Sequence, residues 1–299
     1  MKGATALVTG ASGFLGSHLV RRLLAEGAEV HATSRSAREG GEARLRWHRG
    51  DLAHEGEARA LLRELRPDFV FHLAGQVSAA PSAELVLPAF QSLLGSTVNL
   101  LSAAAEVGCR RLVVTGSLTE PLAAAGDGVA SSPYAVAKWA GNAYARMFHK
   151  LYGVPAVILR PFMAYGPNQH VDKLVPHVIL SLLRGTSPKL ASGRWVGDWI
   201  YVDDVVDGFL LACARPGIEG QDIDLATGVM TSTREIVERL VREIAPRVEP
   251  RFGAVPDRPD EQVRAADVAG AKARLGFEAR ISLDEGLART IAWYRERAC

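Results

Sequence analysis

Tyr134 and Lys138 have the residue types and the spacing for proton-transfer chemistry. They lie four positions apart in a helical pattern over Pro133–Tyr152, which places both side chains on one helix face. A phenol with a pKa of ~10 is a poor base at neutral pH, and an adjacent ammonium favours its phenolate. Ser117, just beyond the apolar segment Arg111–Thr115, can bind the same substrate oxygen. These three residues predict that Tyr134 moves a proton at a hydroxyl while a hydride moves.

A dinucleotide site is predicted near the N-terminus, at the segment Thr9–Gly16 (TGASGFLG). The apolar run Ala4–Val8 leads into it, and the amphipathic pattern Phe14–Glu26 leads out. A strand that ends in a glycine turn opening a helix forms an anion site, because free N–H groups and the positive helix end point into the turn. The spacing is GxxGxxG, not the GxGxxG of the general fingerprint. Alone, either motif is weak, but together with Ser117 they form a specific signal.

The end of the second expected strand, Glu29–Thr33, indicates which dinucleotide binds. An Asp or Glu there would accept both ribose hydroxyls and repel a 2′-phosphate. This chain has Ser34 and Arg35 instead, and Arg35 can pair with a phosphate and stack on adenine. We therefore expect NADP(H), with NAD(H) as the alternative. Asp51 and Leu52, after the third strand, are expected at the adenine edge, although Asp51 could equally cap a helix.

The elements that must position these residues alternate along the first half of the chain. Further strands are expected at 45–48, 69–73, 111–115 and 154–159, and helices at 55–65, 83–107 (broken near Pro88) and 133–152. This rhythm predicts an α/β fold: a doubly wound parallel (Rossmann) sheet that binds ligands at the carboxyl ends of its strands. Later expected segments are strands at 194–202 and 222–226 and helices at 173–184, 204–214, 231–244, 267–275 and 283–296.

The looser rhythm after Arg160 predicts a smaller C-terminal lobe. We expect a dinucleotide-binding domain over residues 1–162, with 199–226 returning to it. Residues 163–198 and 227–299 are expected to form a lobe built from insertions and the C-terminal tail.

Composition and charge exclude several function classes. The 299 residues are 48% hydrophobic and 23% charged with a net charge of +2, so neither a nucleic-acid nor a membrane surface is expected. Three scattered cysteines without a CxxC pair indicate a reducing compartment and no metal site. We find no run of transmembrane length and no signal-peptide layout, and we expect a cytoplasmic protein.

Several motifs, in this order and spacing, resemble the extended short-chain dehydrogenase/reductase family from about residue 4 to about residue 294. They are Thr9–Gly16, His72–Gly75, Ser117, Tyr134–Lys138, Leu159–Phe162, Tyr165–Pro167 and Trp199–Val205. The resemblance implies a nucleotide-sugar substrate and a C-terminal lobe that binds its nucleoside diphosphate. It also implies homodimers formed through a helix bundle that includes the Tyr134 helix.

The resemblance assigns roles residue by residue. The catalytic residues would be Ser117, Tyr134 and Lys138. The cofactor-binding residues would be Gly10, Ser12, Gly13, Phe14, Leu15, Gly16, Ser34, Arg35, Asp51, Leu52, Leu73, Ala74, Gly75, Thr115, Tyr134, Lys138, Pro161 and Met163. The substrate-binding residues would be Gln76, Ser117, Thr119, Glu120, Met163, Arg194 and Arg258.

Departures from the family pattern affect the substrate side. Met163 stands where many relatives carry Asn, and Gly197-Asp198 stands where many carry Arg-Asp, with Arg194 as a nearby substitute. Sugar 4,6-dehydratases place acidic residues two positions past the active-site Ser or Thr; that position is Thr119 here, followed by Glu120.

These features rank four hypotheses for the reaction. The first is an NADPH-dependent reductase of a nucleotide-diphosphate 4-keto(-6-deoxy)hexose, and the alternative is a hexose 4-epimerase with tightly bound NAD. A 4,6-dehydratase is third, because Glu120 alone is a thin case for elimination. A non-catalytic NADP(H)-binding sensor is fourth, because Tyr134 and Lys138 are both present.

Overall fold

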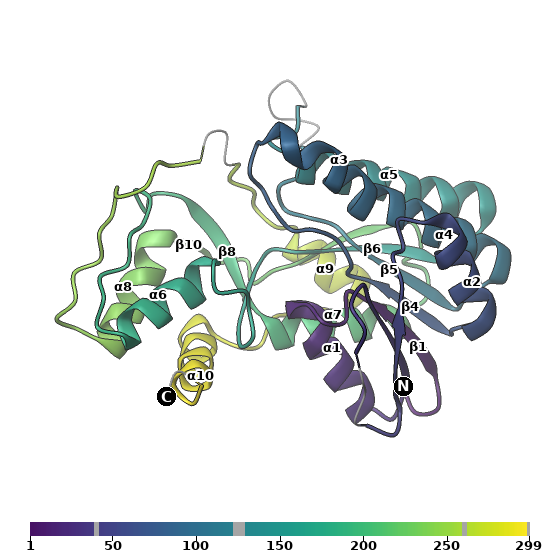
Figure 1. Ribbon diagram of the computed structural model, residues 1–299, viewed down its shortest axis with the longest axis horizontal. Coiled ribbons are helices and arrows are strands. Elements are labelled where there is room, and N and C mark those ends of the chain that lie inside the picture. Colours follow the sequence, from purple (N-terminus) through teal and green to yellow (C-terminus); the bar gives the residue numbers. More distant parts are fainter. Residues whose placement is uncertain (39–41, 122–128, 259–261, 298–299) are drawn as a thin grey trace.

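The computed structural model describes residues 1–38, 42–121, 129–258 and 262–297 and is built on a parallel sheet. Its seven strands lie in the order β3-β2-β1-β4-β5-β6-β9 (Figure 1). They are β1 (Thr5–Thr9), β2 (Glu29–Ser34), β3 (Leu45–Arg49), β4 (Phe69–His72), β5 (Arg111–Thr115), β6 (Ala156–Pro161) and β9 (Asp222–Leu225). The prediction of a doubly wound parallel α/β sheet is confirmed.

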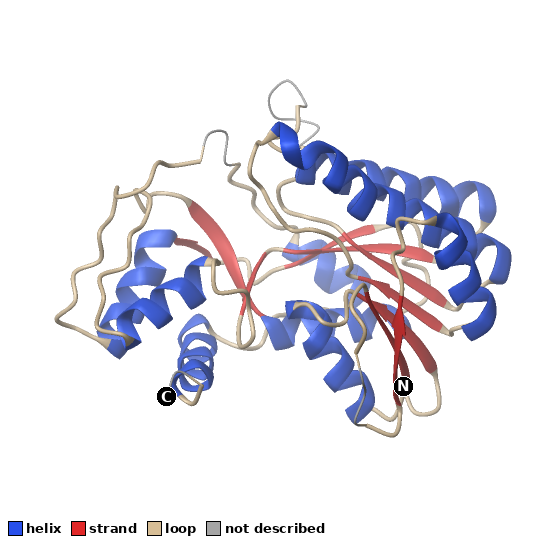
Figure 2. Cartoon of the chain, viewed as in Figure 1, coloured by secondary structure: helices blue, strands red, loops and turns tan. Residues whose placement is uncertain are grey.

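Helices cover both faces of this sheet (Figure 2). On one face lie α1 (Phe14–Ala25), α7 (Val202–Ala214) and α9 (Val268–Leu275), and on the other lie α2 (Glu55–Leu65), α4 (Ser96–Val107) and α5 (Pro133–Tyr152). Strands β4 and β5 are buried along their whole length. Continuous burial explains their unbroken apolar runs, since parallel strands are covered on both sides.

Local signals place α5 against the carboxyl edge of the sheet. The Ser132 hydroxyl accepts a hydrogen bond from the Ala135 N–H, and Pro133 occupies the first helical turn. The helix ends at Gly153, whose φ of 67° is the left-handed conformation common after helices. Tyr134 therefore lies in the first turn of α5, beside the residues that follow β5.

A smaller lobe carries the rest of the chain (Figure 1, left). It contains β7 (Met163–Tyr165), β8 (Val196–Tyr201) and β10 (Met230–Ser232) in the order β10-β8-β7. Helices α6 (Leu174–Leu183), α8 (Thr233–Ile244) and α10 (Leu283–Arg295) share a second apolar core with them. Strands β7 and β10 were not predicted, because three residues carry too little periodicity to reveal a strand.

The predicted division of the chain needs one correction. Helix α9 lies within 227–299, which we assigned to the smaller lobe, but Ala271, Leu275 and Phe277 pack in the core of the large sheet. The predicted return to that sheet is seen at β9, which pairs with β6. At the start of α8, the Ser232 hydroxyl caps the helix by accepting the Glu235 N–H.

The long segment before β5 is less regular than predicted. It consists of the 3₁₀ turn η1 (Ala83–Leu85), α3 (Val86–Ala89), the π-helical stretch η2 (Phe90–Gly95) and α4. By length and mean hydropathy, residues 83–107 could cross a membrane, contrary to our expectation that no run reaches this length. The α4 side chains Leu100, Leu101, Ala103 and Ala104 are buried in the sheet core, while 33% of the apolar window as a whole is buried.

Candidate active site

Tyr134, Lys138, Thr115 and Ser117 come together where β5 ends. The Lys138 ammonium donates to the Thr115 carbonyl oxygen at 2.8 Å and to its hydroxyl at 2.9 Å. The Thr115 hydroxyl in turn donates to the His72 carbonyl oxygen at 3.0 Å. The Ser117 hydroxyl lies 2.9 Å from that of Thr119. The predicted catalytic residues therefore share one corner, with the ammonium tied to the end of β5.

Burial controls the proton affinities of this corner. It raises the pKa of Tyr134; the hydrogen bond with Ser117 lowers this pKa, and the negative charge of Glu120 raises it. Burial lowers the pKa of Lys138 to about 8, although Glu120 opposes this change. We expected the ammonium to favour the phenolate, but it is turned towards Thr115 and the pKa of Tyr134 rises. Without cofactor, Tyr134 is therefore a protonated phenol at neutral pH.

Glu120 requires a correction, because its carboxylate does not face a substrate. It is 2% exposed and accepts from the Ser117 N–H, from Asn142 Nδ2 at 2.8 Å and from Arg160 Nη2 at 3.1 Å. Its place just after the catalytic serine made it a substrate-binding candidate. The sequence could not show that the buried Arg160 of β6 would engage it.

The glycine turn has the geometry of an anion cradle. Gly10 has a φ of 65°, and a Cβ on it would lie 2.7 Å from the Ala74 nitrogen. A Cβ on Gly16 would lie 2.2 Å from the Gly10 carbonyl oxygen. Helix α1 begins without a side-chain cap and without an acidic residue in its first turn, and Ser12 and Gly13 are exposed. These features fit the pyrophosphate of a dinucleotide, bound by backbone N–H groups.

A buried hydrogen-bond relay joins this turn to the helices, and sequence reasoning missed it. The Thr9 hydroxyl accepts the N–H groups of Leu73 and Ala74, at 3.2 and 3.1 Å, so its own proton goes to His72 Nδ1 at 2.8 Å. Burial lowers the pKa of His72 to about 3, with Lys138 adding to the effect, so the ring is neutral. His72 Nε2 then donates to the Thr97 hydroxyl at 3.0 Å.

The far end of this relay lies in the π-helical stretch. The Thr97 hydroxyl donates to the Leu93 carbonyl at 2.6 Å, and Leu93 packs with Tyr134 and Ala137. The relay therefore connects the cofactor-facing backbone after β4 with the surroundings of Tyr134. The sequence offered one signal for this relay: the polar His72 ends the otherwise apolar strand β4.

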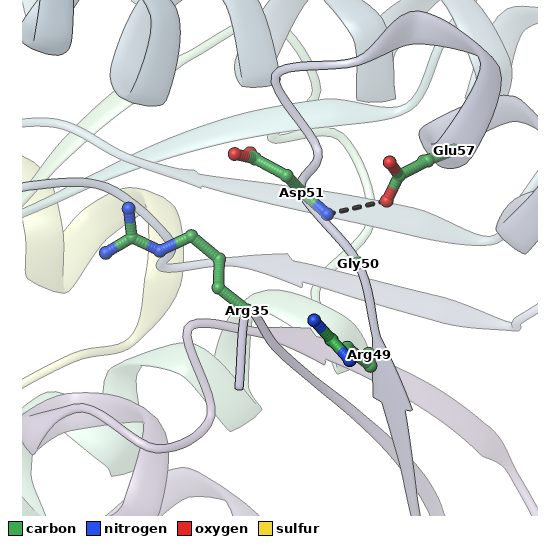
Figure 3. Close-up of a pocket in the computed structure, with 5 residues that line it drawn as sticks. All are labelled: Arg35, Arg49, Gly50, Asp51 and Glu57. Carbon is green, nitrogen blue, oxygen red and sulfur yellow. Dashed lines mark hydrogen bonds between the residues drawn. The ribbon is translucent and has the colours of Figure 1, made fainter. Parts of the chain in front are cut away.

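The predicted adenosine end is a cavity of about 470 Å³ lined by Arg35, Arg49, Gly50, Asp51 and Glu57 (Figure 3). Arg35 is exposed and extends away from Arg49. The Asp51 N–H donates to Glu57 at 2.7 Å, and its carboxylate accepts the Ala53 N–H rather than capping α2. The Leu52 side chain is largely buried, and it lines an adjoining cavity that shares Arg49, Gly50 and Glu57 with this one.

The remaining predicted substrate residues are spread over both lobes. Gln76, Arg194 and Arg258 are exposed, whereas Met163 is partly buried in β7 against Leu118 and Phe162. The roles of Arg194 and Arg258 in substrate binding stay predictions. Ser34 and Pro161 are the last residues of β2 and β6, and Phe14 is the first residue of α1.

The departure at Gly197 has a packing reason. A Cβ at this position would lie 2.3 Å from the Trp195 indole, which covers the glycine. Trp195 also meets Trp199 edge to face, with ring centroids 6.3 Å apart. An arginine at position 197 would displace this indole. The position of Trp195 therefore explains why a glycine stands here instead of an arginine. Across the described ranges of the chain, no cluster of His, Cys, Asp and Glu fits a metal ion.

The geometry thus combines a pyrophosphate turn with a Ser-Tyr-Lys corner. A family model described as the NAD dependent epimerase/dehydratase family matches residues 6–226. The chain belongs to this family. It is accordingly an enzyme of the extended short-chain dehydrogenase/reductase type, and the resemblance predicted from the motifs is confirmed.

Individual relatives cover nearly the whole chain. It is 33% identical to UDP-glucose 4-epimerase of Mycolicibacterium smegmatis, over 98% of this chain and 99% of that protein. It is 30% identical to dTDP-glucose 4,6-dehydratase of an Actinoplanes species, over 97% of both. Among solved structures, MoeE5 in complex with UDP-glucuronic acid and NAD is 31% identical, with a TM-score of 0.87 over 98% of this chain and 99% of that chain.

Proposed function

We propose that this protein is a 4-epimerase of a nucleotide-diphosphate hexose that works with bound NAD. The observation that carries the proposal is the Ser117–Tyr134–Lys138 corner, in which Tyr134 is the proton-transfer group and Glu120, the neighbouring acid, is tied to Arg160. A 4-epimerase needs one proton-transfer group at C4, used twice in opposite directions. The M. smegmatis 4-epimerase, similar over the full length, supports the same reaction.

The chain's own residues supply the proton chemistry. As the phenolate, which an oxidised nicotinamide bound nearby would favour, Tyr134 takes the proton of the C4 hydroxyl and later returns it, and the Ser117 hydroxyl holds the same oxygen. Lys138, four positions beyond Tyr134 on α5, has its ammonium anchored on Thr115. The glycine turn at Gly10, Gly13 and Gly16 would hold NAD, which would supply the hydride chemistry at C4. The 4-keto sugar must turn its other face to the cofactor between the two transfers.

The structure supports an epimerase over a 4,6-dehydratase. Elimination of water needs a base for the C5 proton and an acid for the departing hydroxyl. At the dehydratase position this chain has Thr119, whose hydroxyl meets Ser117, and the following Glu120 accepts three hydrogen bonds in a buried position. Among the described residues beside the corner, no carboxylate is therefore free for this second task.

The reductase that the sequence placed first has weaker support. It rested on Arg35 and on the missing ribose carboxylate, but MoeE5, similar over the full length, binds NAD. Arg35 is an exposed side chain that can bind a 2′-phosphate or lie in solvent. We therefore keep NADP(H) as a second cofactor candidate, to be tested at Arg35 itself.

The test begins with what the protein carries. Nucleotide released from the denatured enzyme is identified chromatographically, and UDP-glucose or UDP-glucuronic acid is then added without reductant. The proposal expects released NAD and a 4-epimeric product. NADPH consumption with a 4-keto sugar would support the reductase, and a product lighter by one water would support the dehydratase. If none of the three reactions is seen with either UDP-sugar, the proposal is overturned.

We also propose a homodimer formed through α5 and the adjoining segment. Val136, Trp139 and Tyr144 form an exposed apolar stripe on α5, and Leu87 and Phe90 are 67% and 56% exposed beside it. Exposed apolar stripes of this kind mark interfaces. Light scattering should give twice the monomer mass, and Trp139→Lys should give the monomer. A monomeric parent protein at micromolar concentration would contradict this proposal.

A further inference from the structure

Glu120 connects three elements around the catalytic corner. Its Oε1 accepts from the Ser117 N–H and from Asn142 of α5, and its Oε2 accepts from Arg160 of β6. Asn142 lies one helical turn beyond Lys138 on the same helix. The carboxylate therefore fixes the Ser117 backbone relative to the helix that carries Tyr134 and Lys138.

Arg160 holds this carboxylate within a larger ion cluster, which we define as Glu120, Arg146, Arg160, Asp222 and Asp224. Arg160 also reaches Asp224 at 2.6 Å and Asp222 at 3.0 Å, and Arg146 reaches Asp222 at 2.9 Å. Burial lowers the pKa of Arg160, but the carboxylates outweigh it and the net change is upward. Because two further carboxylates pair with Arg160, removing the charge of Glu120 does not leave a bare buried cation.

The charged groups of the ion cluster and its surroundings do not affect the catalytic pair equally. They are Arg160 from β6, Asp222 and Asp224 from β9, Arg146 and Lys138 from α5, and Arg264 from the segment before α9. Glu120 raises the pKa of both Tyr134 and Lys138. Asp222 and Asp224 belong to the same cluster but are not among the charges that shift either pKa.

We infer that Glu120 is a positioning residue with two separable roles: it anchors the Ser117 N–H, and it places a fixed negative charge beside the Tyr134–Lys138 pair. Glu120, three positions after Ser117, thus supports the Ser117–Tyr134–Lys138 corner and takes no part in an elimination step. The anchoring role rests on the proposed function, because it is measured through kcat. The charge role needs no substrate.

The charge role is tested by titrating Tyr134 through its tyrosinate absorbance, as the difference between each protein and its Tyr134→Phe version. Glu120→Gln should move the Tyr134 midpoint to lower pH, because a negative charge that disfavours the phenolate is gone. Asp224→Asn, which removes the same charge from the same Arg160, should leave the midpoint in place. Equal movement in both variants, or none in Glu120→Gln, would overturn the charge role. If Glu120→Gln does not fold, Glu120→Ala removes the charge without setting an amide against Arg160, with the same expectation.

The anchoring role is tested with Glu120→Asp. This variant keeps the charge but is one methylene too short to hold both Ser117 and Arg160. We expect the Tyr134 midpoint to stay, and kcat for the UDP-hexose to fall by about tenfold or more with KM nearly unchanged. Full turnover in Glu120→Asp would overturn the anchoring role. Absence of turnover in the parent enzyme would defeat the proposed function instead, and the titration would still decide the charge role.

Discussion

The catalytic corner and the adenosine-end cavity are built in opposite ways. At the corner, Lys138, Thr115 and Ser117 are held by short hydrogen bonds to backbone and neighbouring side chains. The cavity is lined by charged side chains from loops, the end of β3 and the first turn of α2, and Arg35 is exposed. In the proposed function, proton transfer therefore depends on atoms that are held in place, whereas discrimination between NAD and NADP is expected to depend on one exposed side chain.

This difference decides how large each mutational effect should be. A group that is buried and preorganised contributes fully to the transition state, because no ordering cost is left to meet. An exposed guanidinium loses rotamer freedom and solvation when it binds a phosphate, so its net contribution is small. Substitutions at the corner should thus change rates by orders of magnitude, and substitutions at the cavity should change only a preference.

Tyr134→Phe should give the largest effect. Losing the proton-transfer group should lower kcat by about 10²–10⁴-fold, while bound NAD, quantified after denaturation, stays near the parent level. Tyr152→Phe, at the exposed far end of the same helix, is the control and should keep full activity. Retained turnover in Tyr134→Phe would reject this residue as the acid and base, and with it the contrast between the two regions.

Lys138 should give the second largest effect and a pH signature. Burial lowers the pKa of Lys138 to about 8, so the ammonium is present below this pH and is lost above it. We expect kcat/KM to fall as pH rises through about 8, and Lys138→Met to lose about 10²-fold at neutral pH. Lys138→Arg keeps its charge, so its residual activity should lack this alkaline limb. An unchanged limb in Lys138→Arg would assign it to another group.

The corner could be predicted from the sequence because its geometry follows from backbone rules. A four-residue spacing on a helix fixes the relative positions of Tyr134 and Lys138, and a strand end fixes Ser117 beside them. The parallel sheet was predictable for the same reason, since buried strands such as β5 are apolar throughout. Strands β7 and β10 were not, because their pairing depends on residues far away in the chain.

Long-range contacts also explain the misplaced residues. Glu120 was predicted to contact the substrate because it follows Ser117. Its carboxylate is instead bound by Arg160, forty positions later in the chain. The His72 relay was missed because Thr9, His72 and Thr97 meet only after β1 and β4 pair. Side-chain partners of this kind leave no local period in the sequence, so spacing arguments could not reveal them.

Gly16→Ala tests the part of the cofactor site that is built like the corner. The new Cβ would overlap the Gly10 carbonyl oxygen at 2.2 Å, so the turn must open. We expect a loss of stability of about 1–3 kcal/mol and weaker retention of NAD, measured by thermal unfolding and by chromatography. Gly56→Ala in α2, where a Cβ meets nothing within 4 Å, should instead be neutral or stabilising. Equal behaviour of the two variants would show that the glycine turn is not tightly packed.

Arg35→Asp should give the smallest effect, and it addresses the cavity directly. The aspartate would repel a 2′-phosphate and accept ribose hydroxyls, so binding of NADPH should weaken about tenfold relative to NADH, with turnover on bound NAD nearly unchanged. The readout is the ratio of the two dissociation constants, and Arg247→Asp in the distant part of the smaller lobe controls for net charge. A parent ratio already favouring NADH, unchanged in Arg35→Asp, would mean that Arg35 lies in solvent in the complex. A ratio that shifts would assign the nucleotide preference to this one side chain, because Arg49 on the same cavity is left intact.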